Sequence, residues 1–406
     1  MPTIVQFMHL SIEIALLVSA FFLLVLSSVL LVECVAALLP LTFKISSNQR
    51  IKTVVLIPAH NEEAVINSTL TRLKSTSLPH EKIVVIADNC TDATAEIARQ
   101  ARVTVIERQD SERRGKGYAL DYGLKFIASD PPEVVVFVDA DCLVQKNALA
   151  LLTQNTITTG RPVQAAYLMA KPNQPTPKDS ISAFAFKVKN LVRSRGMVRM
   201  GFPCLLAGTG MAFPWSVIRS IDLANSEIVE DMKLGLDLTI AGYPPIFCPD
   251  ARVNGSLPQN SQAAKSQRTR WEHGHLQTLI AYVPKLIVAG TRQKRFDLFF
   301  SALDLCIPPL SLFVAMWFGL MCTSLVFAFT MSIWTPVALV ATAGIFILTA
   351  ILIAWSNFAR SDLPLLELFA VPFYILWKIP LYFKFLIQPQ KTWIRTERDS
   401  TNASEL

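Results

Sequence analysis

The chain has 406 residues, of which 52% are hydrophobic and only 17% are charged. Soluble proteins carry about 25% charged residues, so this composition argues against an ordinary soluble protein and predicts that part of the chain lies in lipid. The formal net charge is +7. We attribute it to basic residues beside membrane segments rather than to a nucleic-acid partner. The seven cysteines show no metal-like spacing, which is typical of free thiols in a reducing cytosol.

A long apolar run lies near the N-terminus, and three more follow residue 297. The first run, within 1–43, exceeds the roughly 20 apolar residues that a bilayer core requires. A retained transmembrane helix is predicted there rather than a signal peptide, because a basic n-region and a small-residue cleavage site are missing. The other runs lie near 299–329, 333–355 and 363–387. The last contains several prolines and two lysines, so a broken or interfacial helix is an alternative to a clean span.

These runs divide the chain into four predicted parts. They are an N-terminal transmembrane helix (1–43), a polar domain (44–297), a C-terminal membrane region with two to three transmembrane or interfacial helices (298–390), and a basic, aromatic tail (391–406). Basic residues flank the polar domain on both sides, which predicts that this domain is cytoplasmic. We therefore expect a multi-pass protein of the inner or plasma membrane. The side on which the C-terminus lies stays open.

Within the polar domain, short apolar strands alternate with helical segments. The strands are expected at "TVVLIPAH", "EKIVVIADN", "VTVIER" and "EVVVFVDAD". Continuous apolar strands that alternate with helices predict an α/β fold, with a mostly parallel sheet covered by helices on both faces. In such sheets ligands bind beyond the carboxyl ends of the strands.

Polar side chains gather where three of these strands end. His60 and Glu62 follow the first strand, Asp88 ends the second, and Asp139 and Asp141 end the fourth. Two carboxylates this close repel each other unless a cation holds them, and Mg2+ or Mn2+ takes such oxygen ligands. Each feature has a plainer interpretation, since Asp88 could belong to a helix cap and the aspartate pair to a solvated turn. Their coincidence at one sheet edge favours a ligand site.

Four motifs in chain order resemble those of the family 2 inverting glycosyltransferases, which have the nucleotide-sugar-binding GT-A fold. The motifs are "IPAHNEE", "VDAD", "VED" (229–231) and "QRTRW" (267–271). The sequence is similar to the membrane-embedded branch with the cellulose, chitin-oligosaccharide, hyaluronan and poly-N-acetylglucosamine synthases. The resemblance covers 50–275 by motif and the flanking helices by layout.

The resemblance implies a donor site for a UDP-sugar. The matching residues are Ala59, His60, Glu62 and Asp88 for uracil and ribose, and Lys116, Asp139 and Arg270 for the diphosphate side. It also implies that Asp139 and Asp141 hold Mg2+ or Mn2+ together with the diphosphate. Positive charge there would stabilise the leaving group during displacement at the anomeric carbon.

The resemblance also implies an acceptor site. Asp231 would act as the general base on the acceptor hydroxyl, with Glu230 beside it as a second catalytic carboxylate. The other residues implied on this side are Gly208, Thr209, Gln267, Arg270 and Trp271. The last three share one face of a helix by their spacing. The residues alone leave alternatives: an acidic first helical turn, a basic surface helix and a plain tight turn.

Two basic segments have possible membrane roles. In the tail, Trp393 and Arg395 could cover the nucleotide site, or they could form an aromatic and basic membrane flank. The segment "ISAFAFKVKNLVRSRGM" is expected to form a helix that could be interfacial, and its basic residues could meet lipid headgroups. Those residues are Lys187, Lys189, Arg193 and Arg195.

The predicted function is that of a membrane-bound, metal-dependent hexosyl- or N-acetylhexosaminyltransferase. It would move a sugar from a UDP-sugar to a growing glycan with inversion, giving a β-linked exopolysaccharide-type polymer. The alternative enzyme adds a single sugar to a lipid-linked acceptor. The expected partners are the donor, a glycan or lipid-linked acceptor and membrane lipid. A catalytically silent scaffold is disfavoured, because the metal, base and QxxRW residues are all present.

Overall fold

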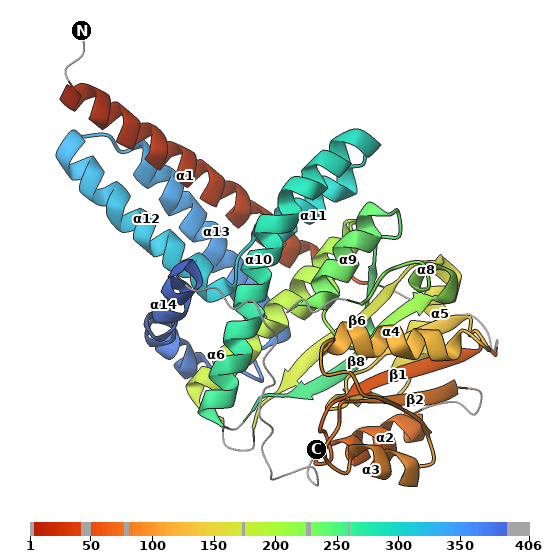
Figure 1. Ribbon diagram of the computed structural model, residues 1–406. Coiled ribbons are helices and arrows are strands. Elements are labelled where there is room, and N and C mark those ends of the chain that lie inside the picture. Colours follow the sequence, from red (N-terminus) through yellow and green to blue (C-terminus); the bar gives the residue numbers. More distant parts are fainter. Residues whose placement is uncertain are drawn as a thin grey trace.

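The computed structural model describes residues 4–41, 50–76, 81–172, 175–224, 229–258 and 260–387. It consists of a sheet domain and a bundle of long helices that projects from it (Figure 1). Within the described residues the sheet has eight strands in the order β3-β2-β1-β4-β7-β6-β8-β5. The strands are β1 (Thr53–Ala59), β2 (Glu81–Asp88), β3 (Thr104–Arg108), β4 (Val134–Phe137), β5 (Leu143–Val144), β6 (Val163–Ala170), β7 (Met211–Pro214) and β8 (Ile246–Ser256).

Helices cover both faces of this sheet. They are α2 (Ile66–Thr76), α3 (Thr94–Gln100), α4 (Lys116–Ile127), α5 (Ala148–Thr159), α8 (Trp215–Ile218) and α9 (Glu230–Ile240). On β1, Val55 and Ile57 pack in a buried cluster with α2, α3 and α5, whereas Val54 and Leu56 pack in another with α4, α8 and α9. Alternate residues of a strand point to opposite faces, so a strand buried on both faces has a continuous apolar sequence. The predicted α/β class is confirmed.

The strand directions are mixed. Strands β3, β2, β1 and β4 are parallel neighbours, and their registers bring the ends of β1, β2 and β4 to one edge. Strand β7 runs antiparallel to β4 and to β6, and β5 runs antiparallel to β8. The parallel half therefore supplies the carboxyl edge at which the sequence predicts a ligand site, and the antiparallel β7 extends the sheet beyond β4.

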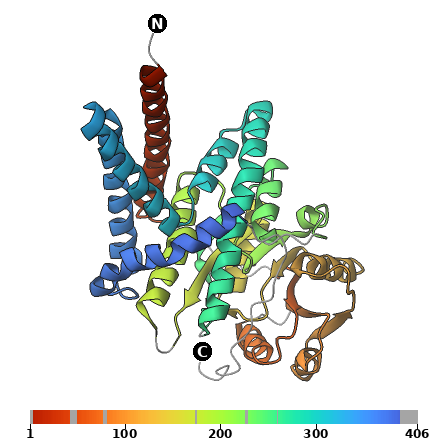
Figure 2. The ribbon, with the colours of Figure 1, turned by 60° about the vertical axis from the view of Figure 1, so that its left-hand side comes forward.

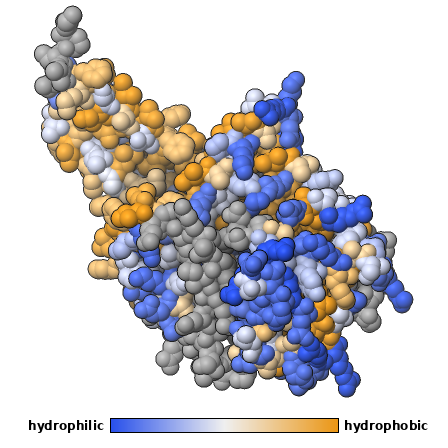
Figure 3. Space-filling model, viewed as in Figure 1, coloured by the Kyte–Doolittle hydropathy of each residue, from blue (hydrophilic) through white to orange (hydrophobic). Residues whose placement is uncertain are grey.

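Four helices in the described part of the chain are long and apolar enough to cross a membrane. Their apolar segments are Gln6–Ala36 in α1 (Ile4–Ala36), all of α12 (Leu310–Met331) and α13 (Thr335–Phe358), and Leu365–Ile387 across η2 (Leu365–Ala370) and α14 (Val371–Ile387). Figure 3 shows apolar residues concentrated on the projecting bundle and polar residues on the sheet domain. The run predicted at 299–329 is interrupted at Pro308 and Pro309, so α11 (Phe296–Cys306) forms a separate helix.

Helix α14 differs in direction from the other long apolar helices. Figure 2 shows it running across one end of the bundle that α1, α12 and α13 form. It lies against α10 (Ser261–Gln293), where His273 Nε2 is 3.1 Å from the carbonyl oxygen of Leu381. Lys378 forms an ion pair with Glu272 of α10. This direction fits the interfacial alternative for the last apolar run better than a span parallel to the bundle.

The bundle is joined to the sheet domain through a helical segment after β6. This segment comprises α6 (Pro177–Lys187), the π-helix η1 (Val188–Arg193) and α7 (Ser194–Arg199). Arg193 is buried and donates hydrogen bonds to Glu33 of α1 (2.9 Å) and to Asp304 of α11 (2.6 Å). A Cβ at Gly196 would overlap the backbone of Glu33, so α7 approaches α1 closely because this residue is glycine.

The lipid-headgroup role suggested for this segment is wrong for the buried Arg193, and the half-buried Lys187 and Arg195 also have partners inside the protein. Arg193 is satisfied by carboxylates inside the protein, and Lys187 forms an ion pair with Asp362. Arg195 donates hydrogen bonds to the backbone carbonyl oxygens of Ala37 and Leu39 at the end of α1. These side chains hold helices together, because a buried cation requires an internal partner.

Candidate active site

The first part of the site lies where β1 and β2 end. Ala59 ends β1, and Nδ1 of His60 is 2.7 Å from the carbonyl oxygen of Asp88 at the end of β2. The buried carboxylate of Asp88 accepts a hydrogen bond from Arg108 at 2.6 Å. Glu62 is also buried, and its backbone N–H donates to Thr94 Oγ1 at 2.7 Å. The predicted nucleoside-side residues therefore lie together at one edge.

Arg108 is a member of this site that the sequence reasoning missed. It follows Glu107 at the end of β3, opposite Asp88 in the parallel register. Its guanidinium also lies 5.7 Å from the ring centre of Tyr118. A basic residue at a strand end that aligns with an acidic strand end was the available signal. The positive charge of Arg108 balances the carboxylate of Asp88, so a ligand that contacts this carboxylate also lies beside Arg108.

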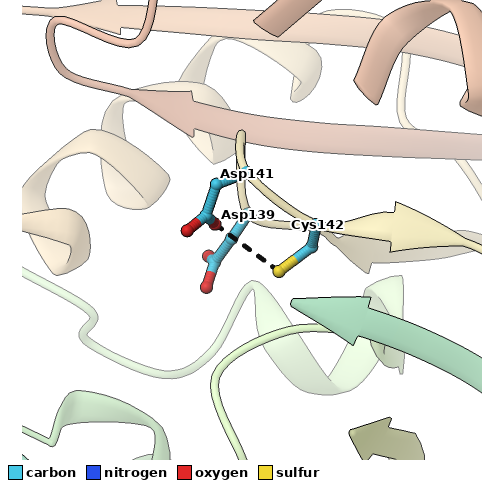
Figure 4. A group of neighbouring side chains, drawn as sticks. All are labelled: Asp139, Asp141 and Cys142. Atoms are coloured by element: carbon cyan, nitrogen blue, oxygen red, sulfur yellow. Dashed lines mark hydrogen bonds between the residues drawn. The ribbon is translucent and has the colours of Figure 1, made fainter. Parts of the chain in front are cut away.

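The second part is the turn after β4, which carries the aspartate pair. Asp139, Asp141 and Cys142 place their oxygen and sulfur atoms within 4.8 Å of one another (Figure 4). Two hydrogen bonds fix the turn. The backbone N–H of Asp139 donates to Thr209 Oγ1 at 3.0 Å, and Thr69 Oγ1 of α2 donates to the carbonyl oxygen of residue 140 at 2.8 Å.

The donor set of this turn suits a hard divalent cation. Asp139 and Asp141 offer carboxylate oxygens, which Mg2+ and Mn2+ prefer. Burial raises the pKa of the Asp139 carboxyl, and repulsion by Asp141 adds to the shift while Lys116 opposes it. Burial and the same two carboxylates also raise the pKa of the Cys142 thiol. A protonated thiol is a poor metal ligand, so the two aspartates are the ligands that fit.

The third part brings a lysine and a tight loop against these carboxylates. Lys116, at the first position of α4, pairs with Asp139 and lies 3.7 Å from Glu230. Its ammonium also donates a hydrogen bond to the carbonyl oxygen of Gly208 at 2.7 Å. Gly208 has a φ of +89°, a conformation that favours glycine. A Cβ there would lie 3.3 Å from Asp231 Oδ2, 3.8 Å from Lys116 Nζ and 3.9 Å from Asp139 Oδ2.

A buried glutamine that the sequence reasoning missed fixes this loop. Gln164 of β6 is 1% exposed. Its side chain donates a hydrogen bond to the carbonyl oxygen of Thr209 at 2.9 Å and accepts one from the backbone N–H of Ala207, also at 2.9 Å. A glutamine inside the apolar strand "VQAAYLMA" was the available signal, because a buried amide needs partners. Gln164 thereby holds the backbone on both sides of Gly208.

The fourth part is the first turn of α9, which carries Glu230 and Asp231. Both side chains are half-buried. Burial raises the pKa of Glu230 to about 7; Lys116 opposes the shift and Asp231 adds to it. Asp231 lies near Gly208, on the side of the site where α9 meets α10. A Cβ at Gly274 of α10 would overlap the side chain of Val229, so the two helices approach closely at that point.

The QxxRW segment lies on α10, as the spacing predicted. Trp271 contacts Phe186 of α6, with ring centres 5.3 Å apart. Gln267 is 5% exposed, and Arg270 is half-buried on the same helix. The neighbouring Arg268 is buried and pairs with Asp179 of α6 at 3.1 Å. The structure brings Trp271, rather than Gln267 or Arg270, to the wall of the cavity described next.

A cavity of about 150 Å³ connects Asp231 with the helices of the bundle. Asp231 and Trp271 form part of its wall on the sheet-domain side. Leu30 of α1, Leu310 of α12 and Lys378 of α14 contribute to the opposite wall. The carboxylate assigned as the base therefore faces a space that reaches the apolar helices. The proposed covering residues of the tail, Trp393 and Arg395, lie outside the described residues, so their role stays a prediction.

Comparison with known proteins assigns the chain to a family. A family model described as glycosyltransferase like family 2 matches residues 50–274, which is more than half of the chain. The chain therefore belongs to glycosyltransferase family 2. The resemblance drawn from the four sequence motifs is confirmed.

Two curated relatives are similar over the same part. The probable glycosyltransferase YdaM of Bacillus subtilis (strain 168) is 27% identical over 262 residues, 61% of each chain. The poly-beta-1,6-N-acetyl-D-glucosamine synthase of Staphylococcus aureus (strain COL) is 23% identical over 258 residues, 60% of this chain and 58% of that protein. The match thus spans about three-fifths of the length of these relatives.

A solved structure shows the same fold. The mannosyltransferase PcManGT from Pyrobaculum calidifontis, in complex with GDP-Man and Mn2+, superposes with a TM-score of 0.54 and 18% sequence identity. The match covers 90% of this chain and 99% of that chain. The predicted GT-A fold is confirmed.

Proposed function

We propose that this glycosyltransferase moves a sugar with inversion from a UDP-sugar to the hydroxyl group of an acceptor at a membrane. The observation that carries the proposal is the convergence at Gly208. Asp139, Lys116 and Asp231 each come within 4 Å of the position that a Cβ would take there. A carboxylate for a cation, a fixed positive charge and a candidate base thus surround one point that a side chain would fill.

The chemistry of direct displacement needs these three groups. Asp231 accepts the proton of the acceptor hydroxyl as that oxygen attacks the anomeric carbon, and the bond to the diphosphate breaks on the opposite side. Lys116 holds positive charge where negative charge develops on the diphosphate. Asp139 and Asp141 would hold Mg2+ or Mn2+, which supplies further positive charge to the leaving group when bound. Attack opposite to the leaving group inverts the anomeric centre, so an α-linked UDP-sugar gives a β-linkage.

The membrane setting of the proposal rests on the helices. We infer a catalytic unit at 44–297 on the cytoplasmic side and a membrane region made of 1–43 and 298–390. The four apolar helices support this division, and the basic residues that flank the polar part support its orientation. Polymer synthesis is the first choice, since a poly-N-acetylglucosamine synthase is among the relatives. The cavity that reaches the apolar helices favours a lipid-linked acceptor as the second candidate.

The test uses the full-length protein purified in detergent. UDP-sugars are screened with Mg2+ or Mn2+, UDP release is measured, and the product from a radiolabelled donor is separated by size. A ladder indicates a polymer and a single shift indicates one addition. We expect Asp231→Asn to lower transfer at least about 100-fold, the usual contribution of a general base, while UDP still binds.

The control is Asp250→Asn, the same change at an exposed position of β8, which should keep the wild-type rate. Full transfer by Asp231→Asn would show that another group accepts the proton. UDP release that is unaffected by removal of divalent cations would contradict the metal assignment.

A further inference from the structure

The cavity beside Asp231 has positively charged residues in its wall, and most of them already have partners. Arg193 is paired with Glu33 and Asp304, and Arg268 is paired with Asp179. Lys378 is paired with Glu272, which itself faces the cavity. The charges of these three residues are therefore balanced inside the protein.

Lys189 is the exception among the cavity's cations in the described part of the chain. It lies on the π-helix η1, one turn before Arg193, and faces the cavity that Asp231 also lines. The partner found for its ammonium is the thioether sulfur of Met232, at 3.7 Å. A thioether is a weak acceptor. Burial lowers the pKa of Lys189, and the charge of Asp231 opposes that shift.

One ring nitrogen of a histidine in the same wall also lacks a hydrogen-bond partner among the described residues. His275 of α10 is 3% exposed, and its Nε2 has no hydrogen-bond partner among the described residues. Burial lowers the pKa of its ring, and the charge of Lys189 adds to that shift. The neutral ring donates to the backbone of 305–307, so its Nε2 is an acceptor. An unsatisfied buried polar atom costs free energy. Lys189 and His275 in one cavity wall therefore indicate a ligand that supplies an acceptor group to the lysine and a donor group, such as a hydroxyl, to the histidine.

The chemistry of the remaining wall restricts that ligand. The wall toward the bundle includes Leu30, Ile307, Pro308 and Leu310, which are apolar and belong to or adjoin the long apolar helices. A ligand that enters from this side must have an apolar portion, and an anionic group is the strongest acceptor that it can offer to the ammonium of Lys189. The hydroxyl that Asp231 would deprotonate must belong to the same ligand if the cavity is the acceptor site.

We propose that Lys189 is the cation of an anion-binding subsite for the acceptor, and that the acceptor is an amphiphile with a phosphate group near its sugar-accepting hydroxyl. The proposal rests on the proposed function for the identity of the base. It places the phosphate between the sheet domain and the membrane helices, with the hydroxyl directed to Asp231.

The test measures binding to the full-length protein in detergent, independently of sugar transfer. Three probes are compared by calorimetry. Dodecyl phosphate and dodecyl β-D-glucoside are used below their critical micelle concentrations, and the third probe is inorganic phosphate. Dodecyl phosphate should bind at least about tenfold more tightly than either of the others, because hydrogen bonds that involve charged groups are the stronger kind. Inorganic phosphate that binds as tightly as dodecyl phosphate would show a site for the free anion and refute the amphiphile.

Variants then assign the preference to Lys189. We expect Lys189→Met to remove the preference for dodecyl phosphate over the glucoside, and Lys189→Arg to keep it. The matched control is Lys125→Met, an exposed lysine of α4 with the same loss of charge. UDP binding by Lys189→Met reports whether the donor half is folded. The wild-type comparison still tests the proposal if that variant does not fold.

Two further outcomes would overturn the inference. In one, the wild-type protein binds dodecyl phosphate and the glucoside equally. In the other, Lys189→Met keeps the preference, which is expected if Lys189 only influences Asp231. Failure of the proposed function looks different, since it would abolish metal-dependent UDP release while leaving the probe affinities intact.

Discussion

Replacement of Arg193 by methionine should strongly destabilise the protein. The side chains of Arg193, Glu33 and Asp304 are 7%, 0% and 7% exposed, so the substitution leaves two carboxylates buried without their cation. Loss of one partner of a buried ion pair costs about 3–5 kcal/mol. With an unfolding entropy of roughly 2.1 cal/mol/K per residue and 406 residues, the expected fall in melting temperature is about 4–6 °C.

The assay is thermal unfolding of the purified protein in one detergent, followed by intrinsic fluorescence at one heating rate. Arg199→Met is the control, because Arg199 lies in the last turn of α7 with an exposed side chain. It should shift the melting temperature by less than about 1 °C, as surface changes usually do.

A triple variant separates lost charge balance from lost packing. Glu33→Leu, Arg193→Met and Asp304→Leu together replace all three charged groups by apolar ones, which is often neutral or stabilising for a buried ion pair. We expect the triple variant to be more stable than Arg193→Met alone. The reasoning would be refuted if Arg193→Met lowered the melting temperature by less than about 1 °C, or if the triple variant were no more stable than Arg193→Met.

Two further predictions concern the site. Gln164→Leu removes the hydrogen-bond partner of the Ala207 N–H and of the buried Thr209 carbonyl oxygen, so transfer should fall at least about tenfold. The metal dependence should be retained, which kinetics at varied Mn2+ check. The raised pKa of Glu230, about 7 against an ordinary 4.5, means that the folded state binds this proton more tightly than the unfolded state. Wild type should therefore lose stability relative to Glu230→Gln as pH rises from about 4.5 to 7, and show no further change above 7; melting temperatures of both proteins in metal-free buffer test it. A difference in melting temperature between the two proteins that stays constant with pH would contradict the raised pKa of Glu230.

Strands and strand ends could be predicted from the sequence for a clear physical reason. Residues of β1 such as Val55 and Leu56 are apolar on both faces, and only a sheet with helices on each side accommodates that pattern. Parallel strands then bring their carboxyl ends to one edge, so the sequence predicts that Asp88 and Asp139 lie near each other. The role predicted for Asp231 rests on family resemblance, because its local sequence pattern alone also fits the ordinary start of a helix.

The partners of buried polar groups could not be predicted. Periodicity shows which face of an element is buried, but it does not show which element lies against it. Gln164 and Arg108 have no motif of their own, and their roles follow from the groups that the fold brings opposite them. The position of α14 across the end of the bundle likewise depends on contacts with α10 rather than on its hydropathy.

The sequence by itself determined the family, the α/β sheet, the long apolar helices and the carboxylates at the strand ends, because local composition and spacing encode them. The tertiary structure decided which charges are balanced. Lys189 and Arg193 lie four residues apart in one basic segment, yet Arg193 meets two carboxylates from distant helices while Lys189 faces the cavity beside Asp231. Long-range packing alone separates a structural cation from one that can bind a ligand.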